Sequence, residues 1–260
     1  MPVAEVNGQR IAYDDTGGDG PAVLFSHGFL MDRTMFEAQV AALADRYRCI
    51  TWDERGFGDT PCDGPFTYWD SADDAVALLD HLGIDRAVFV GMSQGGYLSL
   101  RAALAHPDRV RALVLIDSGA HTDDEETLAG YRSMVEHWLS DEPLGDVGTF
   151  VAGLILGEPE LMRTWVAIWE SRDRSSIRHP AECLLGRDDI SDRVGEITCP
   201  VLIVHGEEDQ AIPIDTAREL CAALPDCRGL VAVPGAAHAP NMTHPDIVNP
   251  ALADFLASLD

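Results

Sequence analysis

The chain has 260 residues, enough for one large α/β domain or two small domains. Acidic residues outnumber basic residues by 44 to 18, which gives a formal net charge of −26, and every basic residue is an arginine. Such a surface repels phosphate backbones and anionic membranes, which argues against nucleic-acid and membrane partners. Hydrophobic residues make up 46% of the chain. They form no run close to the roughly 20 residues of a membrane-spanning helix.

The N-terminus lacks the basic and then apolar order of a signal peptide, so we expect a cytoplasmic protein. The six cysteines show neither C-x-x-C nor Cys/His metal spacing, and we expect them to be reduced core residues. The sequence does not decide whether Cys221 and Cys227 form a disulfide bridge. The sequence also lacks H-E-x-x-H and EF-hand spacing, so we expect neither a metal nor an organic cofactor.

The order of elements along the chain predicts an α/β fold. Residues 10–14 alternate in polarity before the glycines at 17–20 and predict an edge hairpin. Compact apolar runs predict buried parallel strands at 22–26, 48–52, 87–91, 110–116, 199–205 and 229–233. Segments with helical spacing lie at 70–82, 93–106 and 246–259. This alternation indicates a mostly parallel, doubly wound sheet with helices on both faces.

The alternation stops between residues 119 and 196, where short helical segments are separated by prolines. We interpret 119–196 as a helical cap inserted between two strands of a core formed by 1–118 and 197–260. A cap over the carboxyl edge of the sheet would cover the place where open α/β sheets bind ligands. Large apolar side chains of the cap are expected to line the substrate pocket: Met134, Trp138, Phe150, Trp165 and Trp169.

The sequence Gly91-Met92-Ser93-Gln94-Gly95-Gly96 follows the predicted strand at 87–91 and precedes a helix. The pattern G-x-S-x-G between a strand and a helix produces a tight turn that exposes a strained serine hydroxyl. The new helix also directs its first N–H groups toward the same point. Ser93 is therefore the candidate nucleophile.

A serine hydroxyl needs a base, and the chain has nine histidines. His238 lies in a loop of small residues just after the last predicted strand, at the carboxyl edge where the base is required. His244 is the rival, although it adjoins Pro245 at the start of the final helix.

The orienting acid should follow another strand at the same edge. Asp209, after the strand at 199–205, is our choice, and Asp117, after the strand at 110–116, is the alternative. The resulting order Ser, Asp, His is typical of α/β-hydrolases. The negative charge that develops on a carbonyl oxygen requires preorganised donors. We expect these to be the backbone N–H groups of Gln94 and Phe29.

Five segments resemble, in order and spacing, successive motifs of the α/β-hydrolase superfamily. They are HGFLMD at 27–32, DERGFGDT at 53–60, GMSQGG at 91–96, HGEEDQAIP at 205–213 and GAAHAPNMTHP at 235–245. The chain is similar to compact bacterial esterases, 3-oxoadipate enol-lactonases and cofactor-free haloperoxidase-like hydrolases. The resemblance implies a structural role for the loop with Asp53, Arg55 and Gly58. Thr243 departs from the glutamate common at its position.

We therefore expect a serine hydrolase that cleaves small to medium, rather apolar esters or lactones through an acyl-enzyme on Ser93. The protein would act on a small molecule as a monomer or small homo-oligomer. The alternatives are hydrolysis of a carbon–carbon bond or perhydrolysis by the same triad, and a non-catalytic ligand-binding receptor of the same fold. An anionic substrate would need a cap arginine, for which the candidates are Arg163, Arg172, Arg174 and Arg178.

Overall fold

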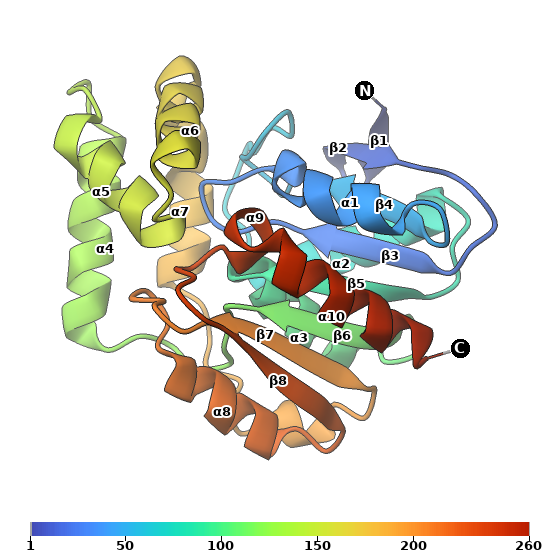
Figure 1. Cartoon of the computed structure of the whole chain (residues 1–260). Coiled ribbons are helices and arrows are strands. Elements are labelled where there is room, and N and C mark those ends of the chain that lie inside the picture. Colours follow the sequence, from blue (N-terminus) through green and yellow to red (C-terminus); the bar gives the residue numbers. More distant parts are fainter. Residues whose placement is uncertain (1, 260) are drawn as a thin grey trace.

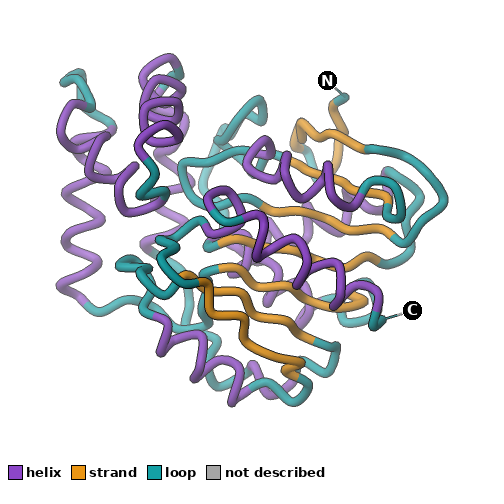
Figure 2. The backbone as a smooth tube through the Cα atoms, viewed as in Figure 1, coloured by secondary structure: helices purple, strands orange, loops and turns teal. Residues whose placement is uncertain are grey.

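The computed structural model describes residues 2–259 and contains an eight-stranded sheet at its centre (Figure 1, Figure 2). The order across the sheet is β1-β2-β4-β3-β5-β6-β7-β8. Strands β3 to β8 run parallel to one another, and β1 and β2 form an antiparallel edge. The strand bounds are β1 Val3–Val6, β2 Gln9–Asp15, β3 Ala22–Ser26, β4 Arg48–Trp52, β5 Ala87–Met92, β6 Val110–Ile116, β7 Val201–Gly206 and β8 Cys227–Val233.

Helices cover both faces of the sheet, which explains why the central strands are mostly apolar. Every residue of β3, β5 and β7 is buried. Helices α1 and α10 pack on one face, and α2, α3 and α8 pack on the other (Figure 1). The bounds are α1 Glu37–Leu43, α2 Tyr68–His81, α3 Gln94–Ala105, α8 Ile214–Ala223 and α10 Pro245–Ala257, with the short elements η1 Arg33–Phe36 and α9 Pro240–Thr243. The predicted fold class is confirmed.

The N-terminal hairpin differs from the prediction. Its turn lies at Asn7-Gly8, between β1 and β2, and not at the glycines 17–20. Both turn residues have positive φ, 49° for Asn7 and 73° for Gly8, as a two-residue hairpin turn requires. The later glycines instead lie in the connection from β2 to β3.

The segment between β6 and β7 is helical and projects from one side of the core (Figure 1). Its elements are α4 Glu125–Trp138, α5 Gly145–Ile155, α6 Pro159–Ser171, η2 Arg174–Ile177, α7 Arg178–Leu185 and η3 Val194–Glu196. Pro159 starts α6, where the missing N–H of proline costs no helical hydrogen bond. These helices lie within the segment that the sequence predicts to be a cap.

Two polar contacts tie this cap to the loop after β3. The indole N–H of Trp169 donates to the carbonyl oxygen of Leu30 over 2.7 Å. Arg172, which follows α6, pairs with the buried Asp32 over 2.5 Å. Because Trp169 is buried, its hydrogen bond is shielded from water, whereas the Arg172 side chain in the ion pair is 36% exposed. Both contacts join α6 to the core.

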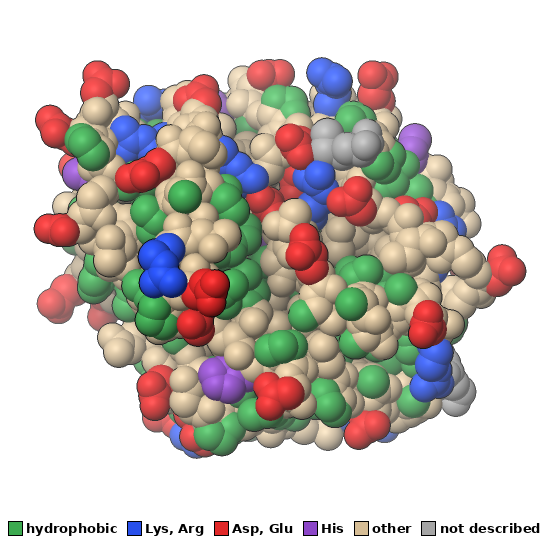
Figure 3. All heavy atoms as spheres, turned by 45° about the horizontal axis from the view of Figure 1, so that its top comes forward, with side chains coloured by type: hydrophobic (Ala, Val, Ile, Leu, Met, Phe, Trp, Pro, Cys, Tyr) green, Lys and Arg blue, Asp and Glu red, His purple; other side chains and the backbone are tan. Residues whose placement is uncertain are grey.

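Acidic side chains are spread across the face shown in Figure 3, with only a few arginines between them. Many of the arginines pair with carboxylates, as Arg48 does with Asp15 and Arg101 with Asp188. Across residues 2–259, no helix combines the length and the apolar character needed to cross a membrane.

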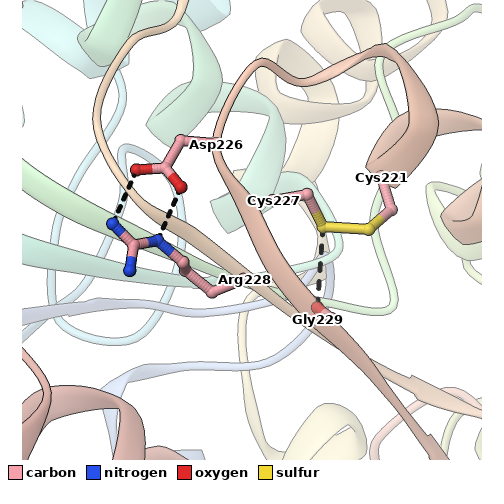
Figure 4. The surroundings of a disulfide bond; sticks show 5 residues. All are labelled: Cys221, Asp226, Cys227, Arg228 and Gly229. Carbon is pink, nitrogen blue, oxygen red and sulfur yellow. Dashed lines mark hydrogen bonds and ion pairs between the residues drawn. A yellow bond between two sulfur atoms is a disulfide. The ribbon is translucent and has the colours of Figure 1, made fainter.

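The structure contains the disulfide that the sequence analysis left undecided, so that two of the six cysteines depart from the expected reduced state. Cys221, in α8, and Cys227, at the start of β8, form a disulfide with a Cα–Cα distance of 5.4 Å (Figure 4). A three-residue connection brings the end of the helix next to the start of the strand, and this proximity decides between the reduced and the bridged state that the sequence left open. Among the four free cysteines, Cys49 and Cys183 are buried, as expected of core residues.

Replacing Cys227 with serine should lower the free energy of unfolding by about 2 kcal/mol, because the unfolded chain loses a short covalent loop. Denaturant unfolding with and without dithiothreitol measures this difference. Wild type and Cys227→Ser should become equally stable in the reductant. The control Cys62→Ser removes a free thiol and should change little under either condition. Equal stability of wild type and Cys227→Ser without reductant would contradict the bridge.

Candidate active site

Ser93 occupies the turn between β5 and α3 and has φ 51° and ψ −115°, a strained conformation for a residue with a side chain. Its backbone N–H donates to Ile116 of β6 over 2.8 Å. Its carbonyl oxygen accepts the Ser118 hydroxyl, also over 2.8 Å. These bonds hold the strained turn from both sides.

Glycines at two positions make this turn possible. A Cβ at Gly91 would overlap the carbonyl oxygen of Gly95, and a Cβ at Gly95 would overlap the carbonyl oxygen of Ser26 at the end of β3. The backbone of α3 therefore touches the neighbouring strand directly. The G-x-S-x-G pattern follows from these contacts.

His238 lies in the loop between β8 and α9 and is 7% exposed. Its Nδ1 lies 2.7 Å from Oδ2 of Asp209, which follows β7. Nδ1 is therefore the donor, and Nε2 is left to act as a base toward the cavity. His244, the rival candidate, instead has its Nδ1 2.8 Å from the Thr243 hydroxyl at the start of α10.

Asp209 accepts three hydrogen bonds. Besides His238, the N–H groups of Ala211 and Ile212 donate to Oδ1 over 2.8 and 3.0 Å. Burial raises the pKa of Asp209, but the attraction of His238 and these hydrogen bonds outweigh it and hold the pKa below its ordinary value. Asp209 thus stays ionised beside the imidazole. Asp117, the alternative acid, forms no hydrogen bond with His238 within residues 2–259.

The hydrogen bonds among residues 2–259 include none between Ser93 Oγ and His238 Nε2. Such bonds are often long before substrate binds and shorten in the reacting complex. Ser93 and His238 nevertheless line the same cavity. The geometry brings the candidate nucleophile and base to one place.

The two predicted oxyanion donors lie on either side of the turn. Gln94 is the first residue of α3, where a backbone N–H has no partner within its helix. Phe29 lines the cavity together with Ser93. In the described part of the chain, neither N–H has a backbone or side-chain acceptor. Both groups are therefore free to donate to a bound carbonyl oxygen.

The loop that carries Phe29 is supported from behind by His27. Its Nδ1 lies 2.8 Å from the carbonyl oxygen of Gly28, and its Nε2 accepts the N–H of Glu54 over 3.0 Å. Burial lowers the pKa of His27, so the ring is neutral and can donate on one side and accept on the other. Next to it, burial raises the pKa of Glu54 to about 8.

The cavity at Ser93 has a volume of about 80 Å³ and lies between the core and the cap. Its walls are mostly apolar. Among the described residues that line it, His238 is the only one with a titratable imidazole, and none is an Asp, Glu or Arg. The lining residues are Gly28, Phe29, Leu30, Met31, Met92, Ser93, Tyr97, Tyr131, Met134, Val151, Leu154, Ile155, Leu184, Ala211, Ile212 and His238.

Of the five predicted pocket residues, only Met134 lines this cavity. Trp138, Trp165 and Trp169 are 2 to 3% exposed and pack into the contact between cap and core. Their apolar area is used to attach the cap, which corrects the prediction for these three. Phe150 is 66% exposed and borders a larger hollow outside the cavity.

This outer hollow has a volume of about 650 Å³. It shares six lining residues with the cavity at Ser93: Tyr97, Tyr131, Met134, Leu154, Ala211 and Ile212. Its other walls are more polar and include Asp123 and Arg187. Sequence reasoning missed Tyr97 and Tyr131. Tyr97 could have been found, because it lies one helical turn after Ser93 on the same face of α3.

None of the four predicted arginines lines the cavity. Arg172 and Arg174 border a separate hollow of about 140 Å³ beside Trp169, and Arg172 is already paired with Asp32. Arg187, whose side chain is 4% exposed, lines the outer hollow instead, where it pairs with Asp123 over 2.6 Å. If one of these four arginines binds a substrate carboxylate, it does so outside the cavity at Ser93.

One group of described residues could hold a metal ion by distance. The ligand atoms of Asp117, His205 and Asp209 lie within 4.8 Å of one another. However, Nε2 of His205 already lies 2.7 Å from the carbonyl oxygen of Ile212, and Asp209 already holds His238. The group is better suited to sharing protons than to binding a cation.

Comparison with known proteins identifies the family. A family described as alpha/beta hydrolase fold matches residues 21–245. The chain belongs to the α/β-hydrolase family. It is thus an enzyme of the α/β-hydrolase superfamily, as the resemblance of its five motifs predicted.

Individual relatives of this α/β-hydrolase carry several activities in their names. The chain is 27% identical to 3-oxoadipate enol-lactonase 2 of Acinetobacter baylyi, with 90% of this chain and 88% of the relative covered. It is 28% identical to a putative carbamate hydrolase, RutD, of a Caulobacter species, with 92% and 91% covered. A thermophilic esterase from Thermogutta terrifontis superposes with a TM-score of 0.91 at 28% identity, covering 100% and 99% of the two chains.

Replacing Glu54 with glutamine should stabilise this α/β-hydrolase more at pH 8 than at pH 5. Between its ordinary pKa of 4.5 and about 8, the glutamate is protonated in the folded state and ionised in the unfolded state. Folding then requires uptake of a proton, so this contribution to stability falls as the pH rises through that range. At pH 8 the gain for Glu54→Gln should reach a few kcal/mol.

Denaturant unfolding across this pH range measures the effect. Glu219→Gln makes the same chemical change at an exposed site of α8 and serves as the control. A pH dependence for Glu54→Gln that runs parallel to wild type would contradict a neutral Glu54.

Proposed function

We propose that this α/β-hydrolase cleaves carboxylic esters or lactones by way of an acyl-enzyme on Ser93. The observation that carries the proposal is that the strained Ser93 and the imidazole of His238, oriented by Asp209, line one apolar cavity. The relatives named enol-lactonase and esterase support this reaction class. A hydroxyl held in such a conformation has no evident structural purpose.

In the proposed reaction, Ser93 Oγ attacks the carbonyl carbon of the substrate while its proton passes to His238 Nε2. The oxyanion of the tetrahedral intermediate accepts hydrogen bonds from the N–H groups of Phe29 and Gln94. Collapse of the intermediate breaks the bond to the alcohol, which takes the proton from His238. A water molecule then repeats both steps on the acyl-enzyme and releases the acid and Ser93.

The size and chemistry of the two hollows indicate the substrate. The cavity of about 80 Å³ is smaller than the roughly 150 Å³ cavity that accepts a benzene ring, so it suits a short apolar acyl group. The larger and more polar outer hollow, of about 650 Å³, suits the leaving alcohol. We therefore propose esters of short, uncharged acids with larger and more polar alcohols.

Ser93→Ala should lose at least about 10⁴-fold in kcat, because no other group can form the acyl-enzyme. A p-nitrophenyl ester series from acetate to decanoate tests this, with the exposed Ser171→Ala as the matched control. Wild type and Ser171→Ala should react with a fluorophosphonate, and Ser93→Ala should not.

Activity that survives in Ser93→Ala would remove Ser93 from the reaction. A p-nitrophenyl carbamate and an anilide of the same acyl group belong in the series, because a relative is named as a carbamate hydrolase. Faster cleavage of either than of the ester would replace the ester proposal. Labelling of Ser93 without turnover of any of these substrates would favour carbon–carbon hydrolysis, and a folded wild type that neither labels nor turns over would favour a receptor.

Ile155→Ala should move the preferred acyl chain to a longer one, because Ile155 lines only the inner cavity and the substitution enlarges it. Rates across the ester series measure the shift. Phe150→Ala, in the same helix, removes an exposed side chain at the outer hollow and should leave chain-length preference unchanged. An unchanged preference in a folded Ile155→Ala variant would place the acyl group elsewhere.

A further inference from the structure

Asp117 directly follows β6 and lies beside the candidate site without contacting its cavity. It is fully buried and has φ 44°, in the left-handed region that aspartate, asparagine and glycine tolerate best. Its N–H donates to Val204 of β7 over 3.0 Å, and its Oδ1 accepts the N–H of Gly206 over 2.9 Å. The side chain is therefore fixed at the carboxyl edge of the sheet.

The carboxyl groups of Asp117 and Asp209 lie side by side inside the protein, with an oxygen atom of each within 4.8 Å of the other. When two buried carboxyl groups lie this close, the negative charge of one disfavours ionisation of the other, so that the pair holds one proton. Asp209 receives three N–H donors, from Ala211, Ile212 and His238. Asp117 receives one, and its Oδ2 accepts no N–H or hydroxyl from any residue between 2 and 259. The negative charge therefore belongs on Asp209 and the proton on Asp117.

We propose that Asp117 is a positioning residue, held as a neutral carboxylic acid whose O–H donates to Asp209, so that the pair presents one negative charge to His238. The proposal rests on the proposed function, in which His238 is the base. Burial and the charge of Asp209 raise the pKa of Asp117 well above its ordinary value, in agreement with this placement of the proton. No proton leaves the pair during the reaction.

The groups around the pair do not supply a competing charge. His205, at the end of β7, has its Nε2 3.7 Å from Asp117 and 3.5 Å from Asp209. Burial lowers the pKa of His205, so its ring is neutral. His238 faces Asp209 from the loop after β8, and Tyr97 on α3 and Tyr131 on α4 lie within electrostatic range of Asp209. Burial raises the pKa of both tyrosines, which keeps them neutral.

Two substitutions of Asp117 test whether it acts on Asp209 as a neutral hydrogen-bond donor or as a second negative charge. Asp117→Asn keeps a donor for Asp209, an acceptor for Gly206 and a residue suited to positive φ. Asp117→Gly deletes the side chain and also tolerates positive φ. We expect kcat of Asp117→Asn to lie within about threefold of wild type. Asp117→Gly should lose about 10- to 100-fold in kcat at unchanged KM, the usual value of one hydrogen bond to a charged group.

The acid limb of the pH profile of kcat distinguishes positioning from a purely structural role. With a neutral Asp117, the midpoint of this limb in Asp117→Asn should stay within about 0.3 pH units of wild type. An ionised Asp117 would favour protonation of His238. Removing that charge would move the midpoint down by about one unit or more, which would overturn the proposal. Wild-type kcat in Asp117→Gly would overturn it as well.

A second measurement needs no substrate. The infrared spectrum of wild type should contain the carbonyl stretch of a protonated carboxyl that is missing in Asp117→Asn at neutral pH. Glu54→Gln removes a different protonated carboxyl and identifies its band separately. An absent Asp117 band would overturn the proposal even in an active enzyme. A band present in a protein that hydrolyses no ester would preserve the proton placement while the proposed function fails.

Discussion

The close approach of α3 to the end of β3 is the constraint on which the site depends. Because Gly95 touches the carbonyl oxygen of Ser26, the chain can reverse from β5 into α3 within one residue, and that residue is Ser93. The same approach brings the start of α3 beside the loop after β3, where Phe29 lies. The serine hydroxyl and the two candidate backbone donors are therefore placed together by a backbone contact, which the Ser118 hydroxyl and the His27 ring support.

Burial sets the protonation state of the acidic side chains around this contact. The surface carries many carboxylates, and three buried acidic residues around the site differ in charge: Asp209 is ionised, whereas burial favours the neutral form of Asp117 and Glu54. The number of N–H donors explains the difference for the aspartates. A strongly acidic chain thus keeps one local negative charge behind its candidate base.

The sequence was sufficient for the parallel part of the sheet and for the position of the residues that follow its strands. Buried parallel strands are continuous apolar runs, so residues 22–26, 48–52 and 110–116 could be recognised without a partner in view. The cap was harder, because an amphipathic helix reveals its apolar face but not what covers it. Trp138 and Trp165 therefore looked like pocket walls and proved to be packing residues. The Asn7-Gly8 pair is itself a typical hairpin-turn sequence, but the glycines at 17–20 offered a second turn signal, and the prediction followed that one. The disulfide and the contact of Asp117 with Asp209 depend on three-dimensional proximity that spacing does not encode.

The bond from the Trp169 indole to the Leu30 carbonyl joins the cap to the residue next to Phe29. Leu30 has φ 65°, so the peptide that precedes it is held in a conformation that a leucine does not adopt unaided. A displacement of α6 large enough to break this bond also removes a restraint on the neighbouring backbone donor. The cap and the loop that carries the proposed backbone donor of Phe29 are thus joined through one indole ring, so that a movement of α6 would be transmitted to this loop.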